Sequence, residues 1–273
     1  MKLVKFTPAV LALIFSVNVH AGLFSSSDDF KCGRDDAVKA LQQYVKDNTS
    51  AMIQSDSLKK ASILLNKPAD VYMGKLDSLS VNIKNVSTTG NTSVSEISCE
   101  AQVDVPLPTE ALDVIHAMPE KMSDLHFRNA KFYNGAVVWK NYTYTLKLAD
   151  NKKDISVVDS MNNSASAALY GAVVLAVNKN EIIKANAQDK VAVAKNDYLV
   201  ADADLNATWK VMPASARNSL KSAQLAWVKS KAAACGKISD ADLATTSAET
   251  SIQIYNCQTK MTNERNAFLG GDN

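Results

Sequence analysis

An alternation of apolar and polar residues predicts β-strands in the first half of the chain. The alternation is clearest over residues 97–105, where every second residue, including Cys99, is apolar or small. Side chains on one face of a strand recur with a period of two, so Cys99 is expected to face the core. A similar alternation begins at Leu79, and residues 88–91 supply the turn chemistry that would return the chain into the second strand.

A tight hairpin is predicted at Asn134-Gly135, because this dipeptide favours the left-handed backbone that two-residue hairpin loops require. In the strand after the turn, the apolar and tyrosine side chains are expected on one face and Trp139 on the other. A last strand is expected at Ile155 and Val157. The predicted inner face comprises Val138, Tyr142, Tyr144, Leu146 and Leu148.

Apolar residues at helical spacing predict helices around this sheet. Residues 35–53 carry an apolar stripe on one side, a shorter helix is expected to end before Pro68, and another is expected to stop at Pro119. Helices that flank an antiparallel sheet form an α+β layer fold. We therefore expect residues 22–160 to form an α+β domain with a cystatin-like or similar half-rolled sheet.

Helical patterns dominate the second half of the chain. Residues 163–199 are rich in alanine and predict one long helix or two, which we interpret as a connector over residues 161–200; their purely apolar part is too short to span a membrane. Residues 201–273 contain three helical segments, one of which is expected to end at Gly236, a residue that suits a helix terminus. This segment is expected to form a small all-α module.

The N-terminus is typical of a secretory signal. Lys2 and Lys5 are followed by an apolar run and by Val19-His20-Ala21, a small-x-small ending that signal peptidase accepts. We expect residues 1–21 to be removed and the mature protein to be periplasmic or secreted, with no membrane span. The mature chain then has 28 basic and 28 acidic residues, without the basic excess expected of a nucleic-acid binder.

The four cysteines favour two disulfide bonds in an exported chain, for which three connectivities exist. Pairing of neighbours, Cys32 with Cys99 and Cys235 with Cys257, keeps each bridge inside one predicted domain, and it is the pairing that we expect. A bridge that closes a loop of some twenty residues stabilises a small helical core by roughly 3 kcal/mol in the chain-entropy model.

Catalytic and cofactor motifs are not found in the sequence. It contains no HExxH or CxxC spacing for a metal, no Gly-x-Ser-x-Gly elbow and no glycine-rich phosphate loop. Its paired carboxylates are close neighbours in the sequence, whereas a glycosidase needs two acids that face each other across a cleft. We therefore expect a protein that is not an enzyme and that uses no cofactor or metal.

A series of positions in the last quarter of the chain carries a family resemblance. The series includes the seven residues between Trp227 and Cys235 and the second cysteine, Cys257. The six motif residues of the series are Leu205, Asn206, Gln224, Trp227, Thr262 and Arg265. This pattern, over residues 201–269, resembles the LprI-type lysozyme inhibitor family. Members commonly carry Arg-Asp where this chain has Lys231 and Ala232, so a bidentate contact and an acidic partner are missing here.

The resemblance implies an exported, non-enzymatic inhibitor of lysozyme or another muramidase that protects a bacterial envelope by occupying the cleft of that enzyme. The segment from residue 236 to residue 246 is our candidate for insertion, since a loop fixed at both ends loses less conformational entropy on binding. Its candidate inhibitory residues are Ser239, Asp240 and Asp242.

Two alternatives are kept. In the first, the α+β domain binds a small ligand or an envelope partner and the C-terminal module is only a helical adaptor. An exposed Trp139, opposite the face of Tyr142 and Tyr144, would favour this alternative, since aromatic side chains are common at binding surfaces. In the second, the protein is an immunity-type partner of a muramidase effector and binds one cognate enzyme tightly.

Overall fold

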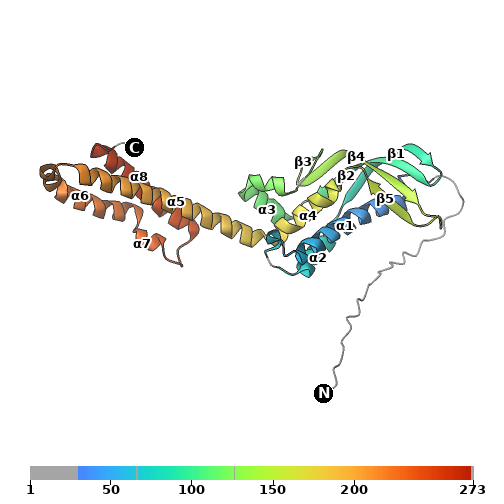
Figure 1. The fold of residues 1–273 in the computed structure, drawn as a ribbon, viewed down its shortest axis with the longest axis horizontal. Coiled ribbons are helices and arrows are strands. Elements are labelled where there is room, and N and C mark those ends of the chain that lie inside the picture. Colours follow the sequence, from blue (N-terminus) through green and yellow to red (C-terminus); the bar gives the residue numbers. More distant parts are fainter. Residues whose placement is uncertain (1–29, 66, 126, 272–273) are drawn as a thin grey trace, which may run out of the picture.

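The structure is a computed structural model that describes residues 30–65, 67–125 and 127–271. It is elongated, with an α+β domain at one end and an all-helical module at the other, joined by one long helix (Figure 1). The predicted signal sequence, residues 1–21, lies outside the described residues. Within the described ranges, no helix combines the length and the apolar character needed to cross a membrane.

The α+β domain is built on a five-stranded antiparallel sheet. Strands β1 and β2 form one hairpin, β2 pairs along β4, and the opposite edge of β4 carries β3 near one end and β5 near the other. The predicted α+β class and antiparallel sheet are confirmed. The strands are β1 (Asn82–Ser93), β2 (Glu96–Pro106), β3 (Lys131–Tyr133), β4 (Ala136–Leu148) and β5 (Ile155–Asp159).

The two hairpin predictions differ in outcome. Asn134 and Gly135 adopt φ values of 48° and 73° between β3 and β4, so the predicted tight turn is confirmed. The first hairpin instead turns at residues 94–95, and the predicted turn at residues 88–91 was wrong. That segment lies within β1, where register shifts interrupt the pairing with β2 and accommodate the turn-forming residues.

The prediction that Trp139 faces away from the core was wrong. Trp139 is fully buried, together with Val137 on its side of the strand, and its Nε1 donates a hydrogen bond to the Arg128 carbonyl oxygen at 2.7 Å. Two residues of β4 lie between the partners of Ala101 and Val103, a bulge that exchanges the inward and outward positions. The tyrosines beyond the bulge face the core, as expected, so both halves of β4 bury their large side chains.

Helix α1 (Asp35–Leu58) confirms the first predicted helix, and it buries every fourth residue from Ala37 to Ile53. The second helix was predicted on the wrong side of Pro68. Before this proline the chain forms only the single 3₁₀ turn η1 (Ser62–Leu64), whereas α2 (Ala69–Asp77) follows it. Proline is well suited to the start of a helix, where its missing N–H is not needed.

Helix α4 lies within the core of the α+β domain and is buried on nearly all sides. Gly171 allows this position, because a Cβ atom there would collide with the Asp124 carbonyl oxygen of η2. The segment predicted as a connector, residues 161–200, therefore divides between this core helix and the long helix α5. The elements concerned are α3 (Thr109–Ala117), η2 (Pro119–Leu125), α4 (Ser164–Val177) and α5 (Lys179–Val211).

Polar contacts fasten the start of α5 to the α+β domain. Asn178, between α4 and α5, is fully buried; its Nδ2 donates to the Ile63 carbonyl oxygen at 3.0 Å and its Oδ1 accepts from the Tyr72 hydroxyl at 3.0 Å. Lys67 Nζ lies 3.0 Å from Glu181 Oε1 in the first turn of α5. The helix therefore leaves the domain from a fixed base.

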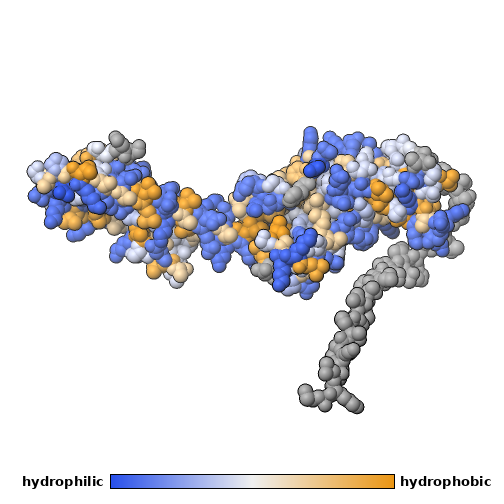
Figure 2. Space-filling model, in the orientation of Figure 1, coloured by the Kyte–Doolittle hydropathy of each residue, from blue (hydrophilic) through white to orange (hydrophobic). Residues whose placement is uncertain are grey.

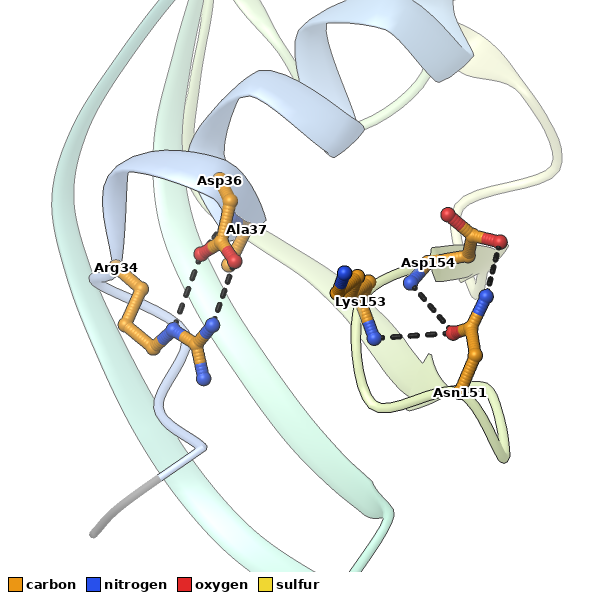
Figure 3. Close-up of polar contacts among 6 residues, drawn as sticks. All are labelled: Arg34, Asp36, Ala37, Asn151, Lys153 and Asp154. Carbon is orange, nitrogen blue, oxygen red and sulfur yellow. Dashed lines mark hydrogen bonds and ion pairs between the residues drawn. The ribbon is translucent and has the colours of Figure 1, made fainter. Parts of the chain in front are cut away.

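Side-chain contacts also order the opposite end of the domain (Figure 3). At the start of α1, Arg34 Nη2 lies 2.6 Å from Asp36 Oδ2, and Asp36 Oδ1 accepts the Ala37 backbone N–H at 2.9 Å. In the β4–β5 turn, Asn151 Oδ1 accepts the Asp154 backbone N–H at 3.1 Å. Asparagine and aspartate side chains stabilise turns in this way because they satisfy backbone donors that no strand partner reaches.

Both predicted disulfide bonds are confirmed. Cys32 pairs with Cys99, which fastens the segment before α1 to the buried face of β2, and Cys235 pairs with Cys257 in the helical module. The module comprises the distal part of α5 with α6 (Ala214–Cys235), α7 (Ile238–Ala241) and α8 (Ala248–Phe268). Helix α6 runs back toward the domain and α8 follows the direction of α5 (Figure 1). Gly236, at φ 87°, ends α6 as predicted.

Candidate functional site

The C-terminal module has only a small apolar core. Ala194, Ala241, Ile254 and Tyr255 are its buried apolar cluster, and the Cys235–Cys257 bond joins the end of α6 to α8 beside them. Polar side chains are buried in the same module, namely Lys231, Ser251, Gln258, Thr262 and Asn266. The interior of the module therefore depends on specific polar contacts as well as on apolar packing.

Cationic and aromatic side chains from α5, α6 and α8 lie next to one another in alternation. Lys231 Nζ lies 5.3 Å from the ring centre of Tyr198 and 4.9 Å from that of Trp227. Arg265 Cζ lies 5.8 Å from the ring centre of Trp227 and 4.8 Å from that of Phe268. A cation over an aromatic face is attracted by the ring quadrupole. These five residues form a continuous series, which we call the cation–aromatic layer.

Hydrogen bonds join the cation–aromatic layer to the other motif residues. Lys231 Nζ donates to Thr262 Oγ1 at 3.0 Å, and Thr262 Oγ1 donates to the Gln258 carbonyl oxygen at 2.6 Å. Arg265 Nε donates to Gln224 Oε1 at 2.7 Å. The structure thus brings Gln224, Trp227, Thr262 and Arg265 together between α6 and α8, where they hold the helices at their spacing.

The two remaining motif residues, Leu205 and Asn206, lie apart from this layer on α5. Leu205 is buried, whereas Asn206 is exposed and its Nδ2 donates to Asp202 Oδ2 at 3.0 Å, one helical turn earlier. Neighbouring helix positions point in different directions, so one of the pair serves packing and the other stays at the surface.

The absence of an acid at position 232 agrees with the surroundings of Lys231 and Arg265, which lack a carboxylate hydrogen-bond partner among the described residues. Lys231 is only 6% exposed, and its hydrogen bond to Thr262 is to a neutral oxygen. Burial lowers the pKa of the Lys231 amine, and the charge of Asp202 opposes this shift. Arg265 Nη2 is buried and makes no hydrogen bond within the described part of the chain. Two cations therefore share this interior with no carboxylate hydrogen-bonded to either of them among the described residues.

The candidate inhibitory segment, residues 236–246, is held in place by several hydrogen bonds. Gln258 Nε2 donates to the Gly236 carbonyl oxygen at 2.5 Å, next to the disulfide. Ser251 Oγ donates to the Ala241 carbonyl oxygen at 2.8 Å, and Thr246 Oγ1 closes the segment on the Asp240 carbonyl oxygen at 2.6 Å. The segment includes the short helix α7 and has a fixed conformation.

Asp242 is one of the contacts that fix this segment. Its Oδ1 accepts from Lys195 Nζ on α5 at 2.7 Å and from the Tyr255 hydroxyl on α8 at 2.6 Å. These hydrogen bonds, with that of Lys195 the larger contribution, hold the pKa of the Asp242 carboxyl below its usual range. The structure therefore places Asp242 as an anchor between α5 and α8.

The other two candidates, Ser239 and Asp240, are exposed, and the Ser239 hydroxyl donates to the neighbouring Asp240 Oδ1 at 3.3 Å. Close in sequence to them, Leu243 is 55% exposed. We call Ser239, Asp240 and Leu243 the loop tip. A role for Leu243 was not predicted from the sequence. A leucine among the polar and alanine residues that follow Ile238 could have indicated it.

A second surface feature was also missed. An open groove of about 690 Å³ runs between α5 and α8 and is lined mainly by polar side chains. Asp197 lines it from α5, and Asn256, Lys260, Asn263 and Glu264 are among the residues that line it from α8. Neither the groove nor any other described region gathers three histidine, cysteine or carboxylate side chains that could hold a metal ion.

Comparisons with known proteins concern this module alone. No curated protein and no solved structure matches the chain, so the cystatin-like sheet stays a prediction. A family model described as "Lysozyme inhibitor LprI" matches residues 183–269. The match begins within α5, before the resemblance noted from residue 201, and it includes all six motif residues and the loop tip. The C-terminal region, residues 183–269, is therefore similar to the LprI lysozyme inhibitor family.

Proposed function

We propose that the protein is a non-enzymatic inhibitor of lysozyme or another muramidase and that it acts outside the cytoplasm to protect a bacterial envelope. The match of residues 183–269 to the LprI family model carries this proposal. Two disulfide bonds support the location, because such bonds persist mainly in oxidising compartments. The burial of Trp139 removes the exposed aromatic side chain that would have favoured the adaptor alternative.

The inhibitory surface in this proposal is the loop tip. Ser239, Asp240 and Leu243 offer an apolar side chain beside a hydroxyl and a carboxylate on a segment that is already ordered. Ordering before binding lowers the entropic cost of association. Asp242 has a positioning role, because its bonds to Lys195 and Tyr255 hold the tip in place. In a cleft lined by carboxylates, Asp240 would need a shared proton or a bridging water.

The activity is tested by measuring lysis of peptidoglycan by c-type, g-type and i-type lysozymes with the full-length, oxidised mature protein. Saturable inhibition of at least one class is expected. Inhibition confined to a single cognate enzyme, with the three general classes unaffected, would instead indicate the immunity-type alternative. Lysis unchanged by a micromolar excess of the protein against every enzyme tried would overturn the proposal.

The loop tip is tested separately with the variant S239A/D240A/L243S. It is expected to raise the concentration needed for half inhibition by more than tenfold, since residues at the centre of an interface each contribute on the order of 1 to 2 kcal/mol. The control variant D204A/L225S changes one exposed acid and one exposed leucine elsewhere in the same module and is expected to inhibit normally. Equal inhibition by the tip variant and the control would exclude the loop tip while leaving the inhibitor function intact.

A further inference from the structure

Apolar side chains are exposed together where the α+β domain meets the long helix. Leu58 is 86% exposed at the end of α1, and Ile63, Leu65 and Val71 are each at least 40% exposed on or beside η1 and α2. Among the described residues of this domain, these are half of the eight large apolar side chains that are exposed. Figure 2 shows apolar surface in this region, next to the narrow part of the molecule. Grouped exposure of this kind marks an interaction surface more often than scattered residues do.

Two lysines belong to the same surface. Lys59 and Lys60 directly follow Leu58, are exposed, and form no ion pair within the described residues. Of the acids nearest in the sequence, Asp56 is half-buried and accepts a hydrogen bond from the Tyr170 hydroxyl at 2.5 Å, whereas Asp70 is exposed and keeps its negative charge beside Val71. The surface therefore combines apolar side chains with two exposed lysines and one exposed carboxylate, a small excess of positive charge. We call Leu58, Lys59, Lys60, Ile63, Leu65 and Val71 the neck patch.

The backbone of the neck patch is left-handed at two positions. Lys60 has φ 50° and Leu65 has φ 44°, both in the left-handed region that bulky residues rarely occupy. Burial of the Leu65 side chain does not account for its conformation, because this side chain is 44% exposed. Both conformations instead end helical turns. Lys60 follows α1, where the Ala61 N–H donates to the Asp56 carbonyl oxygen at 2.8 Å. Leu65 ends η1, where its N–H donates to the Ser62 carbonyl oxygen at 3.0 Å. The segment between α1 and α2 is therefore held by its own backbone hydrogen bonds.

We propose that the neck patch binds the surface of a bilayer that contains anionic phospholipids. Apolar side chains that enter the boundary between headgroups and acyl chains, beside lysines that meet anionic headgroups, are the chemistry of interfacial membrane binding. A protein partner fits less well, since protein interfaces usually rely on aromatic or arginine anchors and the neck patch contains neither. The residues of the patch line neither the groove between α5 and α8 nor the cavity beside Met122, Phe127 and Arg128.

The binding is tested by sedimenting the full-length, oxidised mature protein with vesicles. Vesicles of equal parts phosphatidylglycerol and phosphatidylcholine are compared with vesicles of phosphatidylcholine alone, at low salt and in 0.5 M NaCl. The protein is expected to sediment with the anionic vesicles and to be released by salt, because the lysine contribution is electrostatic. No sedimentation with the anionic vesicles would overturn the proposal.

Two variants assign the binding to the neck patch. K59E/K60E is expected to lower vesicle affinity by more than tenfold, since each lysine near an anionic surface contributes roughly a fivefold factor. I63S/L65G removes two apolar side chains, and glycine at position 65 suits the left-handed backbone, so this variant should keep the fold. Circular dichroism and thermal melting of each variant check that it is folded.

Matched controls change the same kinds of residue at other surfaces of the α+β domain. K131E/K140E reverses two exposed lysines on β3 and β4, and V94S/V158S removes two exposed valines. Both controls are expected to bind vesicles like the unmodified protein. Equal losses in the controls and the patch variants would show that the attraction is not local and would overturn the proposal. Size exclusion with light scattering tests for a dimer. A dimer that depends on the patch, in the absence of vesicle binding, would also overturn the proposal, because it would assign the patch to a second copy of the chain.

Discussion

Lys231 is the residue whose setting differs most from that of an ordinary surface lysine. It lies between the rings of Tyr198 and Trp227, and Thr262 Oγ1 accepts its hydrogen bond. The rings and Asp202 favour the charged amine, whereas removal from water opposes it; the effect of burial is the larger, so the pKa is lowered. At neutral pH this amine is therefore a cost to folding that an apolar residue of similar length would not have.

The substitution Lys231→Met is expected to stabilise the protein at pH 7 by on the order of 1 kcal/mol, because it removes a buried polar group that lacks a charged partner. A lysine with a lowered pKa binds fewer protons in the folded state than in the unfolded state at alkaline pH. The unmodified protein should therefore gain stability relative to the variant as the pH rises toward about 10.4, the pKa of an unfolded lysine. Urea denaturation at several pH values measures this difference.

The control for this prediction is Lys229→Met, at an exposed position on the same helix. Its stability relative to the unmodified protein should vary little with pH. A difference between the unmodified protein and Lys231→Met that stayed constant from pH 7 to pH 10 would show that the Lys231 amine titrates normally.

At the scale of elements, regular periodicity was enough to predict most of the sheet and α1. It failed where an element departs from its ideal period. A strict period of two carried through the bulge of β4 placed Trp139 on the wrong face, although it placed Tyr142 and Tyr144 correctly beyond the bulge. The proline rule failed at Pro68 because a proline that ends one helix and a proline that starts the next leave a similar local signal.

The helix α4 shows a second limit of the sequence. It is buried on nearly all sides, so no polar face distinguishes a core helix from a connector between domains. Of the candidate site, the disulfide and the motif residues could be predicted, because spacing and resemblance are properties of the chain. The anchoring of Asp242 by Lys195 and Tyr255 could not be, since it depends on contacts between elements far apart in sequence.

The two disulfide bonds are expected to stabilise their own domains independently. In the chain-entropy model, loss of the Cys235–Cys257 bond, with a separation of 22 residues, costs about 3 kcal/mol, and loss of the Cys32–Cys99 bond, with a separation of 67, costs about 4 kcal/mol. The variants C235S/C257S and C32S/C99S test this by urea denaturation. Trp139 fluorescence reports on the α+β domain, and Trp209 and Trp227 report on the helical module; a loss of either bridge that destabilised both parts equally would contradict the prediction.

At the scale of the whole molecule, α5 determines the shape. It has 33 residues, so it is about 50 Å long at 1.5 Å per residue, and its base is held by Asn178 and Lys67. Between the domain and the module, residues 184–190 of this helix are exposed or only half-buried. The helical module is thus held at a distance from the domain, with the loop tip accessible to a large partner.

The extended shape predicts a large radius of gyration in solution. A compact chain of about 250 residues has a radius of gyration near 18 Å. Small-angle X-ray scattering of the mature protein should give a radius of gyration well above this value, because α5 separates the α+β domain from the helical module. A value near 18 Å would show that the module folds back onto the α+β domain.

The central claim, that the module inhibits a lysozyme by occupying its cleft, is tested most directly by competition. Binding of the full-length, oxidised protein to an inhibited lysozyme is measured by calorimetry with and without a chitin oligosaccharide that fills the same cleft. We predict saturable binding that weakens as the oligosaccharide concentration rises, and weaker binding by S239A/D240A/L243S. Binding that the oligosaccharide leaves unchanged would contradict occupation of the cleft, and no binding to any lysozyme would contradict the inhibitor function itself.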